Sequence, residues 1–144
     1  MSIEKTVISR SEAETEALGA RIASQQTRGT VVLLRGDLGA GKTVFARGFA
    51  RGLGIDEAVS SPTYTIVQEY DLARGGRLYH LDLYRIADAG AALDFGIDEF
   101  LNDKNSISLI EWPERIESLL PPEAITVEIV HRSETEREIH VRYP

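Results

Sequence analysis

A run of eight residues near the start of the chain carries its strongest chemical pattern. The run matches G-x-x-x-x-G-K-[ST], a phosphate-binding loop. An apolar stretch at residues 30–35 leads into it and a helix-forming stretch at residues 43–51 follows, which is the strand–loop–helix context that the motif requires. The eight residues are Gly36, Asp37, Leu38, Gly39, Ala40, Gly41, Lys42 and Thr43.

The residue types in this pattern suit a nucleotide polyphosphate. Glycines let the backbone turn so that successive N–H groups of residues 37–43 point at phosphate oxygens, and the following helix adds its positive N-terminus. Lys42 supplies a cation for the β- and γ-phosphates and is therefore also a catalytic candidate. The hydroxyl of Thr43 is a hard oxygen ligand that suits Mg²⁺. The alternative is a Gly-rich turn with an incidental lysine, which the flanking stretches disfavour.

Hydrolysis or transfer of a phosphate also needs a carboxylate near the Mg²⁺. Glu111 ends an apolar run that is typical of a central strand, so we predict a catalytic acid that also associates with the metal. Asp82 ends another β-rich run and is a second catalytic candidate, with His80 on the same face of the strand. Structural roles stay open: Glu111 at a solvent-facing strand end, or Asp82 at a hairpin edge or paired with Arg85. His80 is equally well explained as a hydrogen-bonded strand histidine.

Three further features bear on the nucleotide. Residues 61–65 read Ser-Pro-Thr-Tyr-Thr and follow the phosphate-loop helix, where nucleotide hydrolases carry segments that contact Mg²⁺ or the γ-phosphate. An ordinary Ser-Pro turn explains them equally well. Trp112 is expected to pack in the interior, or else to lie near the nucleotide or a partner. Residues 102–105 have the wrong order for the guanine-reading Asn-Lys-x-Asp pattern, which favours adenine.

The remaining pattern predicts alternating helices and strands. Ser11 and Glu14 form a capping box that begins a helix reaching about residue 24. The other expected elements are a hairpin (66–70 with 78–84), two short helices broken at Gly96 (87–102), a strand (106–112), a short helix to about residue 120, and a second hairpin (125–130 with 138–142). The predicted fold class is α/β, a three-layer fold like that of P-loop NTPases. Its mixed parallel and antiparallel sheet has helices on both faces, within one domain spanning residues 1–144.

Composition excludes several classes of function. The chain has no cysteine, and its three histidines lack the spacing of a zinc site. No apolar run approaches the length of a membrane span and the N-terminus does not resemble a signal peptide, so a cytoplasmic protein without membrane contact is expected. The net charge of −7 argues against direct binding of nucleic acid. The arginines near the loop, Arg35, Arg47 and Arg51, are expected to serve phosphates or solvent.

Four motifs in this order resemble the bacterial TsaE family. They are the loop at 36–43, the Ser-Pro-Thr-Tyr-Thr run at 61–65, His-Leu-Asp-Leu-Tyr-Arg at 80–85, and Glu-Trp-Pro-Glu-Arg at 111–115. The resemblance implies an ATPase, with ATP and Mg²⁺ as cofactors, that supports formation of threonylcarbamoyladenosine in tRNA. It also implies TsaD and TsaB as protein partners, with tRNA reached only through them. Tyr64 is a departure, since phenylalanine is common there.

The resemblance also implies roles for individual residues. Lys42 and Thr43 take the phosphate and Mg²⁺ roles, Glu111 matches the second Mg²⁺-associated acid, and Asp82 matches a catalytic candidate. Residues at the start of the first helix and after the fifth expected strand match positions where the family holds adenine. These are Ser11, Thr15 and Arg132.

Two other functions remain open from the sequence alone. A small-molecule kinase would share the loop, but such kinases usually need an acceptor pocket and an Arg-rich lid, which this short chain does not display. A nucleotide-gated binding module would use ATP only to set a conformation. The presence of both Asp82 and Glu111 argues for hydrolysis over such a module.

Overall fold

The structure is a computed structural model, and it describes residues 2–37, 39–59 and 66–144. Its helices and strands follow the expected order, with one additional strand at the N-terminus. In chain order they are β1 (Ile3–Ser9), α1 (Glu12–Ser24), β2 (Val31–Arg35), α2 (Lys42–Gly52), β3 (Val67–Asp71), β4 (Arg77–Asp82), α3 (Ala89–Phe95), α4 (Ile97–Leu101), β5 (Ser106–Glu111), the 3₁₀ helix η1 (Pro113–Leu119), β6 (Ile125–His131) and β7 (Arg137–Tyr143).

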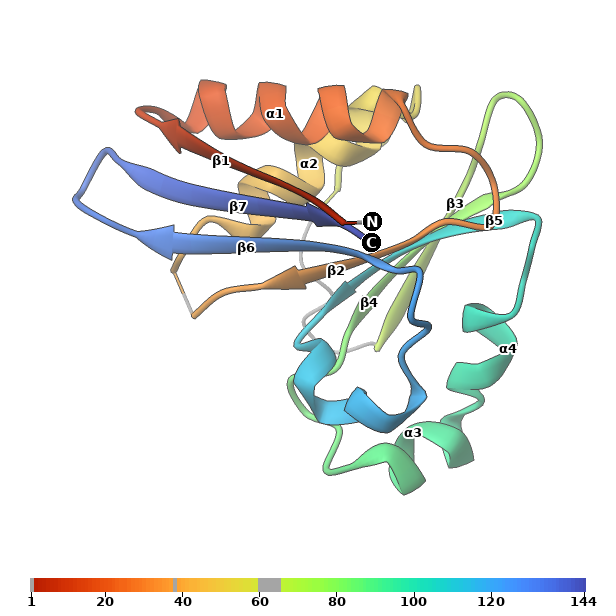
Figure 1. Ribbon diagram of the computed structural model, residues 1–144. Coiled ribbons are helices and arrows are strands. Elements are labelled where there is room, and N and C mark those ends of the chain that lie inside the picture. Colours follow the sequence, from red (N-terminus) through yellow and green to blue (C-terminus); the bar gives the residue numbers. More distant parts are fainter. Residues whose placement is uncertain (1, 38, 60–65) are drawn as a thin grey trace.

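The strands form one mixed sheet in the order β1-β7-β6-β2-β5-β4-β3. The four strands β6, β2, β5 and β4 run parallel to one another, whereas β3 pairs antiparallel with β4, β7 with β6, and β1 with β7. Helices α1 and α2 cover one face and α3, α4 and η1 lie against the other (Figure 1). The α/β three-layer class predicted from the sequence is confirmed, as are both hairpins.

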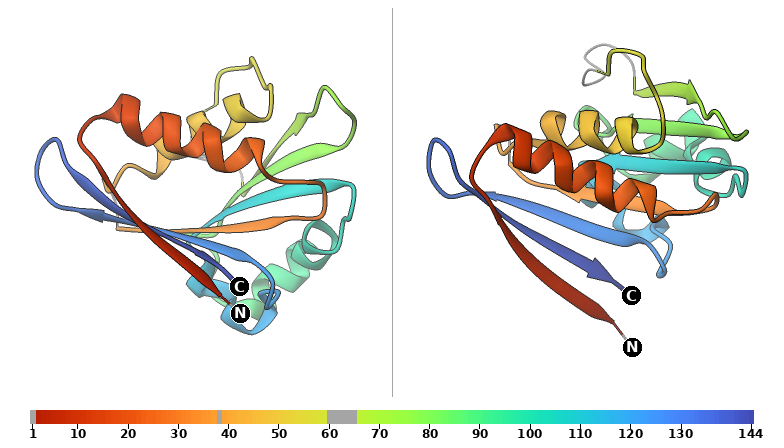
Figure 2. Two further views of the ribbon diagram at one scale, coloured as in Figure 1. Left: turned by 45° about the horizontal axis from the view of Figure 1, so that its top comes forward. Right: turned by 90° about the horizontal axis from the view of Figure 1, so that it is seen from above.

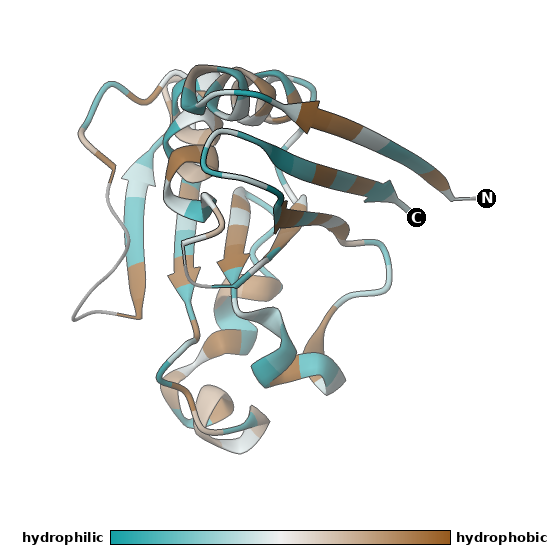
Figure 3. Cartoon of the chain, turned by 90° about the vertical axis from the view of Figure 1, so that its left-hand side faces the viewer, coloured by the Kyte–Doolittle hydropathy of each residue, from teal (hydrophilic) through white to brown (hydrophobic). Residues whose placement is uncertain are grey.

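Each face of the sheet has its own apolar cluster. The cluster under α1 and α2 includes Phe45 and Phe49, and the cluster under α3, α4 and η1 includes Leu83 and Ile97. All six residues of β5 are buried, because the strand lies inside the sheet with helices on both sides. Strand β7 instead alternates hydrophilic and hydrophobic residues toward the C-terminus (Figure 3), as expected of a strand with one face in the core.

The capping box at the start of α1 is present, but its second hydrogen bond involves the backbone of Arg10 and not that of Ser11. The backbone N–H of Glu14 donates to the hydroxyl of Ser11 at 3.1 Å. The Glu14 carboxylate reaches back to the N–H of Arg10, one residue before the cap, at 2.9 Å. Both hydrogen bonds satisfy backbone donors at the entry to the helix, so they fix where α1 begins.

Helices α1 and α2 approach each other closely because glycines lie at their contact. A Cβ atom built on Gly48 would lie 1.9 Å from the carbonyl oxygen of Glu16, and one on Gly52 would lie 2.2 Å from that of Ala20. Gly19 on α1 is similarly close to the backbone of α2. This contact fixes the direction of α2, whose first turn carries Lys42 and Thr43.

We expect Gly48→Ala to lower the free energy of unfolding by about 3 kcal/mol, because the new methyl group would force the helix backbones apart. Alanine has the higher helix propensity by about 1 kcal/mol, so propensity alone predicts that the substitution raises the free energy of unfolding. Urea unfolding measures the change. The matched control is Gly90→Ala, at an exposed site in α3 with ordinary contacts for a methyl group, which should be neutral or stabilising. Equal stability of wild type and Gly48→Ala would contradict the close packing.

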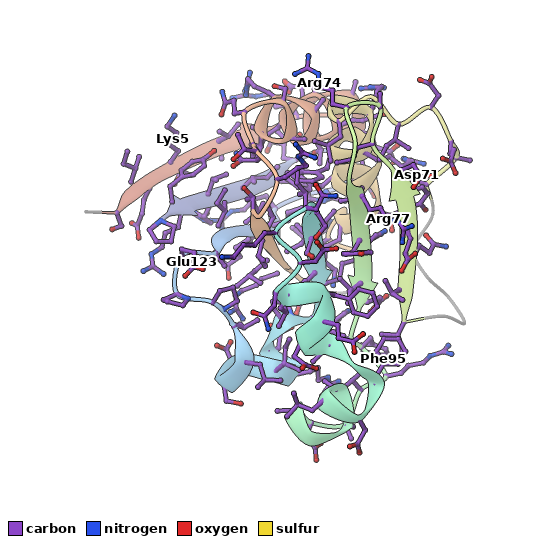
Figure 4. The ribbon with its side chains drawn as sticks, turned by 90° about the vertical axis from the view of Figure 1, so that its right-hand side faces the viewer. Lys5, Asp71, Arg74, Arg77, Phe95 and Glu123 are labelled. Carbon is purple, nitrogen blue, oxygen red and sulfur yellow. The ribbon has the colours of Figure 1, made fainter. Side chains whose placement is uncertain are left out.

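The N-terminal strand β1 has no counterpart among the elements predicted from the sequence. It forms one edge of the sheet, and most of its residues are exposed. The opposite edge, β3, carries Asp71, which forms an ion pair with Arg77 at 3.6 Å (Figure 4). Charged side chains on an exposed edge oppose the pairing of sheets between molecules.

Candidate active site

The loop between β2 and α2 has the backbone of a phosphate cradle. Gly41 caps α2 with φ of 109°, and Gly39 has φ of 79°, both of which favour glycine. Among the described residues, no side chain caps α2, so the amide groups of its first turn are open to a ligand. Leu38 lies outside the described residues, and the loop is described at Gly36, Asp37 and residues 39–41.

Lys42 is the first residue of α2 and is almost fully buried, with 6 % of its surface exposed. Its Nζ lies 4.0 Å from the centroid of the Trp112 ring and has no hydrogen-bond acceptor among the described residues. Burial lowers the pKa of Lys42, and the nearby carboxylates, Glu111 first and then Asp82, oppose that decrease. A buried ammonium group without an acceptor costs free energy, which an incoming anion would recover.

The two predicted acids lie side by side at the carboxyl edge of the sheet. Asp82 ends β4 and is paired in register with Glu111, which ends β5. Glu111 is 3 % exposed, so the interpretation of a solvent-facing strand end is excluded. Burial raises the pKa of Asp82, while the N–H of Tyr84, which donates to its carboxylate at 3.0 Å, opposes the increase. The sheet thus places two carboxylates next to the ammonium of Lys42.

His80 contacts Glu111 directly. Its Nε2 lies 2.6 Å from Oε2 of Glu111, and both side chains are buried. Because a carboxylate only accepts hydrogen bonds, the hydrogen lies on Nε2 when Glu111 is ionised. Nδ1 of His80 is then left without a partner among the described residues. The expectation of a hydrogen-bonded strand histidine is met, and its partner is the predicted catalytic acid.

The two predicted metal ligands, Thr43 and Glu111, are oxygen donors of the kind that Mg²⁺ takes, and their role stays a prediction. Thr43 is exposed in the first turn of α2, and Glu111 is buried at the end of β5. Within residues 2–37, 39–59 and 66–144 there is no group of three or more histidine and carboxylate side chains that could hold a metal alone. Magnesium commonly takes one or two protein ligands and completes its shell with phosphates and water.

The residues proposed to hold adenine lie near the start of α1 and the β6–β7 hairpin. Ser11 caps α1, and Thr15 is buried with its hydroxyl 2.6 Å from that of Ser9. Arg132 is half-exposed and forms an ion pair with Glu138 at 2.5 Å. Each of the three has an internal partner, and their role toward adenine stays a prediction.

Two arginines near the loop have structural partners. Arg35 forms ion pairs with Glu114 and Glu117 of η1, and Arg51 binds Glu16 across the contact of α1 and α2. The side chain of Arg51 is 59 % exposed, as expected of an arginine that faces solvent, whereas that of Arg35 is 26 % exposed. Contact of either arginine with phosphate stays a prediction. Residues 61–65, expected to contact Mg²⁺ or the γ-phosphate, lie outside the described residues.

Trp112 and Arg137 also contribute to the site, and the sequence pointed only to Trp112. Trp112 has the left-handed φ of 57° and covers the ammonium of Lys42. Arg137 donates through Nε to the carbonyl of Ala40 at 2.8 Å. The adjacency of Trp112 to Glu111 gave a weak indication, whereas Arg137 is 97 positions from its partner and no local pattern could reveal it.

The part of the chain that contains the loop and the two acids also matches a known protein family. The family described as "Threonylcarbamoyl adenosine biosynthesis protein TsaE" matches residues 9–139, which include the loop, both acids, β6 and the start of β7. The chain belongs to the TsaE family. The family acts in tRNA threonylcarbamoyladenosine biosynthesis. The resemblance inferred from the four motifs is thereby confirmed.

Individual TsaE proteins are similar along most of the chain. The protein from Bacillus subtilis is 44 % identical over 88 % of this chain and 77 % of its own length. The protein from Treponema pallidum is 39 % identical over 93 % of this chain and 97 % of its own length. The protein from Aquifex aeolicus is 38 % identical over 98 % of this chain and 98 % of its own length. The crystal structure of Bacillus subtilis YdiB superposes with a TM-score of 0.83 at 36 % identity, covering 99 % of this chain and 87 % of that one.

Among residues 2–37, 39–59 and 66–144, none of the helices is both long enough and apolar enough to cross a bilayer.

Proposed function

We propose that this chain binds ATP with Mg²⁺ and hydrolyses it, and that this hydrolysis supports threonylcarbamoyladenosine formation in tRNA by a complex of TsaB and TsaD. The observation that carries the proposal is the buried ammonium of Lys42, which has no acceptor among the described residues and lies at the start of α2 beside Asp82 and Glu111. Such a cation at a helix N-terminus suits a polyphosphate.

The residues have separable roles in this proposal. Backbone amides of the loop and Lys42 bind the phosphates, and Thr43 and Glu111 hold the metal, which when bound would neutralise charge on the phosphates. Asp82 is half-buried with a raised pKa, so it suits a group that orients a water molecule or accepts its proton. His80 holds the Glu111 carboxylate in one orientation.

Release of inorganic phosphate separates this proposal from its two alternatives. With ATP and Mg²⁺, we expect slow release by the chain alone and faster release when TsaB and TsaD are added. A small-molecule kinase would consume ATP only with a metabolite acceptor. A nucleotide-gated binding module would bind ATP without turnover in either condition.

Contact with tRNA is proposed to run through the partner proteins, because a net charge of −7 disfavours a polyanion. Filter binding of tRNA to the isolated chain at physiological salt should therefore give no specific signal. A sub-micromolar dissociation constant would contradict the charge argument.

A further inference from the structure

Arg137 begins β7 and connects two distant segments of the chain. Its Nε donates to the carbonyl of Ala40 in the phosphate-binding loop at 2.8 Å. Its Nη1 donates to the carbonyls of Ser133 and Glu136 in the β6–β7 turn, at 2.8 Å and 3.0 Å. The loop and the turn of this hairpin lie at the same end of the sheet in each view of the ribbon (Figures 1 and 2). One guanidinium therefore joins the loop to the turn.

The bond to Ala40 determines the direction of a neighbouring amide. Ala40 is 2 % exposed, and none of the described peptide bonds is cis. In a trans peptide the carbonyl of one residue and the N–H of the next point in opposite directions. When Arg137 holds the Ala40 carbonyl toward β7, the N–H of Gly41 points away from β7, and this amide belongs to the motif that cradles phosphate.

Arg137 differs in its partners from other arginines of the hairpin. Among the described residues it makes no ion pair, and its three described hydrogen bonds all go to backbone carbonyls. Arg132 and Arg142, by contrast, pair with the carboxylates of Glu138 and Glu4. The positive charge of Arg137 is thus not neutralised by a carboxylate, although it lies beside a loop that would hold an anion.

We propose that Arg137 is a positioning residue for the phosphate-binding loop: it holds the Ala40 carbonyl outward and the Gly41 N–H inward, and it couples the loop to the β6–β7 turn. The inference rests on the proposed function, because it assumes that the loop binds a nucleotide. It assigns Arg137 to nucleotide affinity and does not give it contact with the reacting atoms.

Calorimetric titration with ADP–Mg²⁺ tests the assignment. We expect Arg137→Met to weaken ADP binding about tenfold or more, the usual result of losing a hydrogen bond from a charged donor. Arg137→Lys should recover part of the affinity, because an ammonium group can still donate to the Ala40 carbonyl. The matched control is Arg142→Met, on the same strand but exposed and paired with Glu4, which should bind like wild type.

Amide hydrogen exchange supplies a readout that a merely structural role would not change. Arg132 and Ser133 donate their N–H groups to the Glu136 carbonyl within the turn that Arg137 holds. ADP should slow exchange of these amides in wild type and in Arg142→Met, and should leave it unchanged in Arg137→Met. If Arg137→Met does not fold, both measurements are made on Arg137→Lys. This variant is expected to bind ADP more weakly than wild type.

The outcomes distinguish failure of the assignment from failure of the proposed function. Folded Arg137→Met with wild-type affinity, or with the wild-type exchange response to ADP, would overturn the assignment alone. Arg137→Lys binding as weakly as Arg137→Met would also overturn it, because packing rather than the donor would then be responsible. A wild-type chain that does not bind ADP would overturn the proposed function and the assignment together.

Discussion

Replacing Lys42 by alanine should weaken binding of ATP–Mg²⁺ at least 100-fold, which is about 2.8 kcal/mol at 1.4 kcal/mol per tenfold. The ammonium is buried beside Asp82 and Glu111, so a polyphosphate would otherwise meet two carboxylates without a cation to balance them. Calorimetric titration measures the loss.

The fold should survive this substitution. Lys42 has no hydrogen-bond acceptor among the described residues, so its removal ends the cost of burying its charge. This gain offsets the loss of its contact with the Trp112 ring and of its attraction to Glu111 and Asp82. We expect the melting temperature of the nucleotide-free variant to equal or exceed that of wild type. The control is Lys104→Ala, at an exposed site, with wild-type affinity expected. Unchanged affinity in folded Lys42→Ala would contradict the phosphate role.

Glu111 is expected to have the largest effect on hydrolysis. Glu111→Ala should bind ATP but hydrolyse it on the order of 10²–10³ times more slowly, the typical cost of losing one prepositioned group. It would also leave His80 without its hydrogen-bond partner. Glu111→Gln is therefore the sharper variant, since its amide oxygen can still accept from Nε2 while the charge is lost.

Asp82→Asn should show a loss of similar size. Steady-state phosphate release with TsaB and TsaD present measures all three variants, and ATP titration confirms that each still binds. If Glu111→Gln or Asp82→Asn turns over at the wild-type rate, that side chain is structural. A rate lost in Glu111→Ala and kept in Glu111→Gln would mean that Glu111 serves only to satisfy His80.

The sequence predicted the part of the site that local patterns encode. The loop motif lies between a buried strand and a helix, and the apolar run before Glu111 forms the buried strand β5. Parallel strands end at one edge of a sheet, so the placement of Asp82 and Glu111 at that edge also follows from their positions at the ends of two β-rich runs. These features depend on neighbouring residues and on periodicity, both of which a single sequence contains.

The contacts that the sequence did not predict join residues far apart in the chain. Most residues of strand β1 are exposed, so no apolar pattern marks it as a strand. It forms only because it pairs with β7, which lies at the other end of the chain. The hydrogen bond from Arg137 to Ala40 and the ion pair of Arg35 with η1 likewise join segments that are distant in the sequence. The close approach of Gly48 to Glu16 depends on the packing of two helices, which local sequence patterns do not reveal.

The proposed function requires that ATP hydrolysis by this chain supports threonylcarbamoyladenosine formation by TsaB and TsaD. The most direct measurement counts threonylcarbamoyladenosine residues formed per TsaD in a reaction with TsaB, tRNA, a preformed threonylcarbamoyl donor and this chain, with either ATP or a non-hydrolysable analogue. We expect many products per TsaD with ATP and about one or fewer with the analogue. Equal yields of many products with both nucleotides would contradict the proposed function.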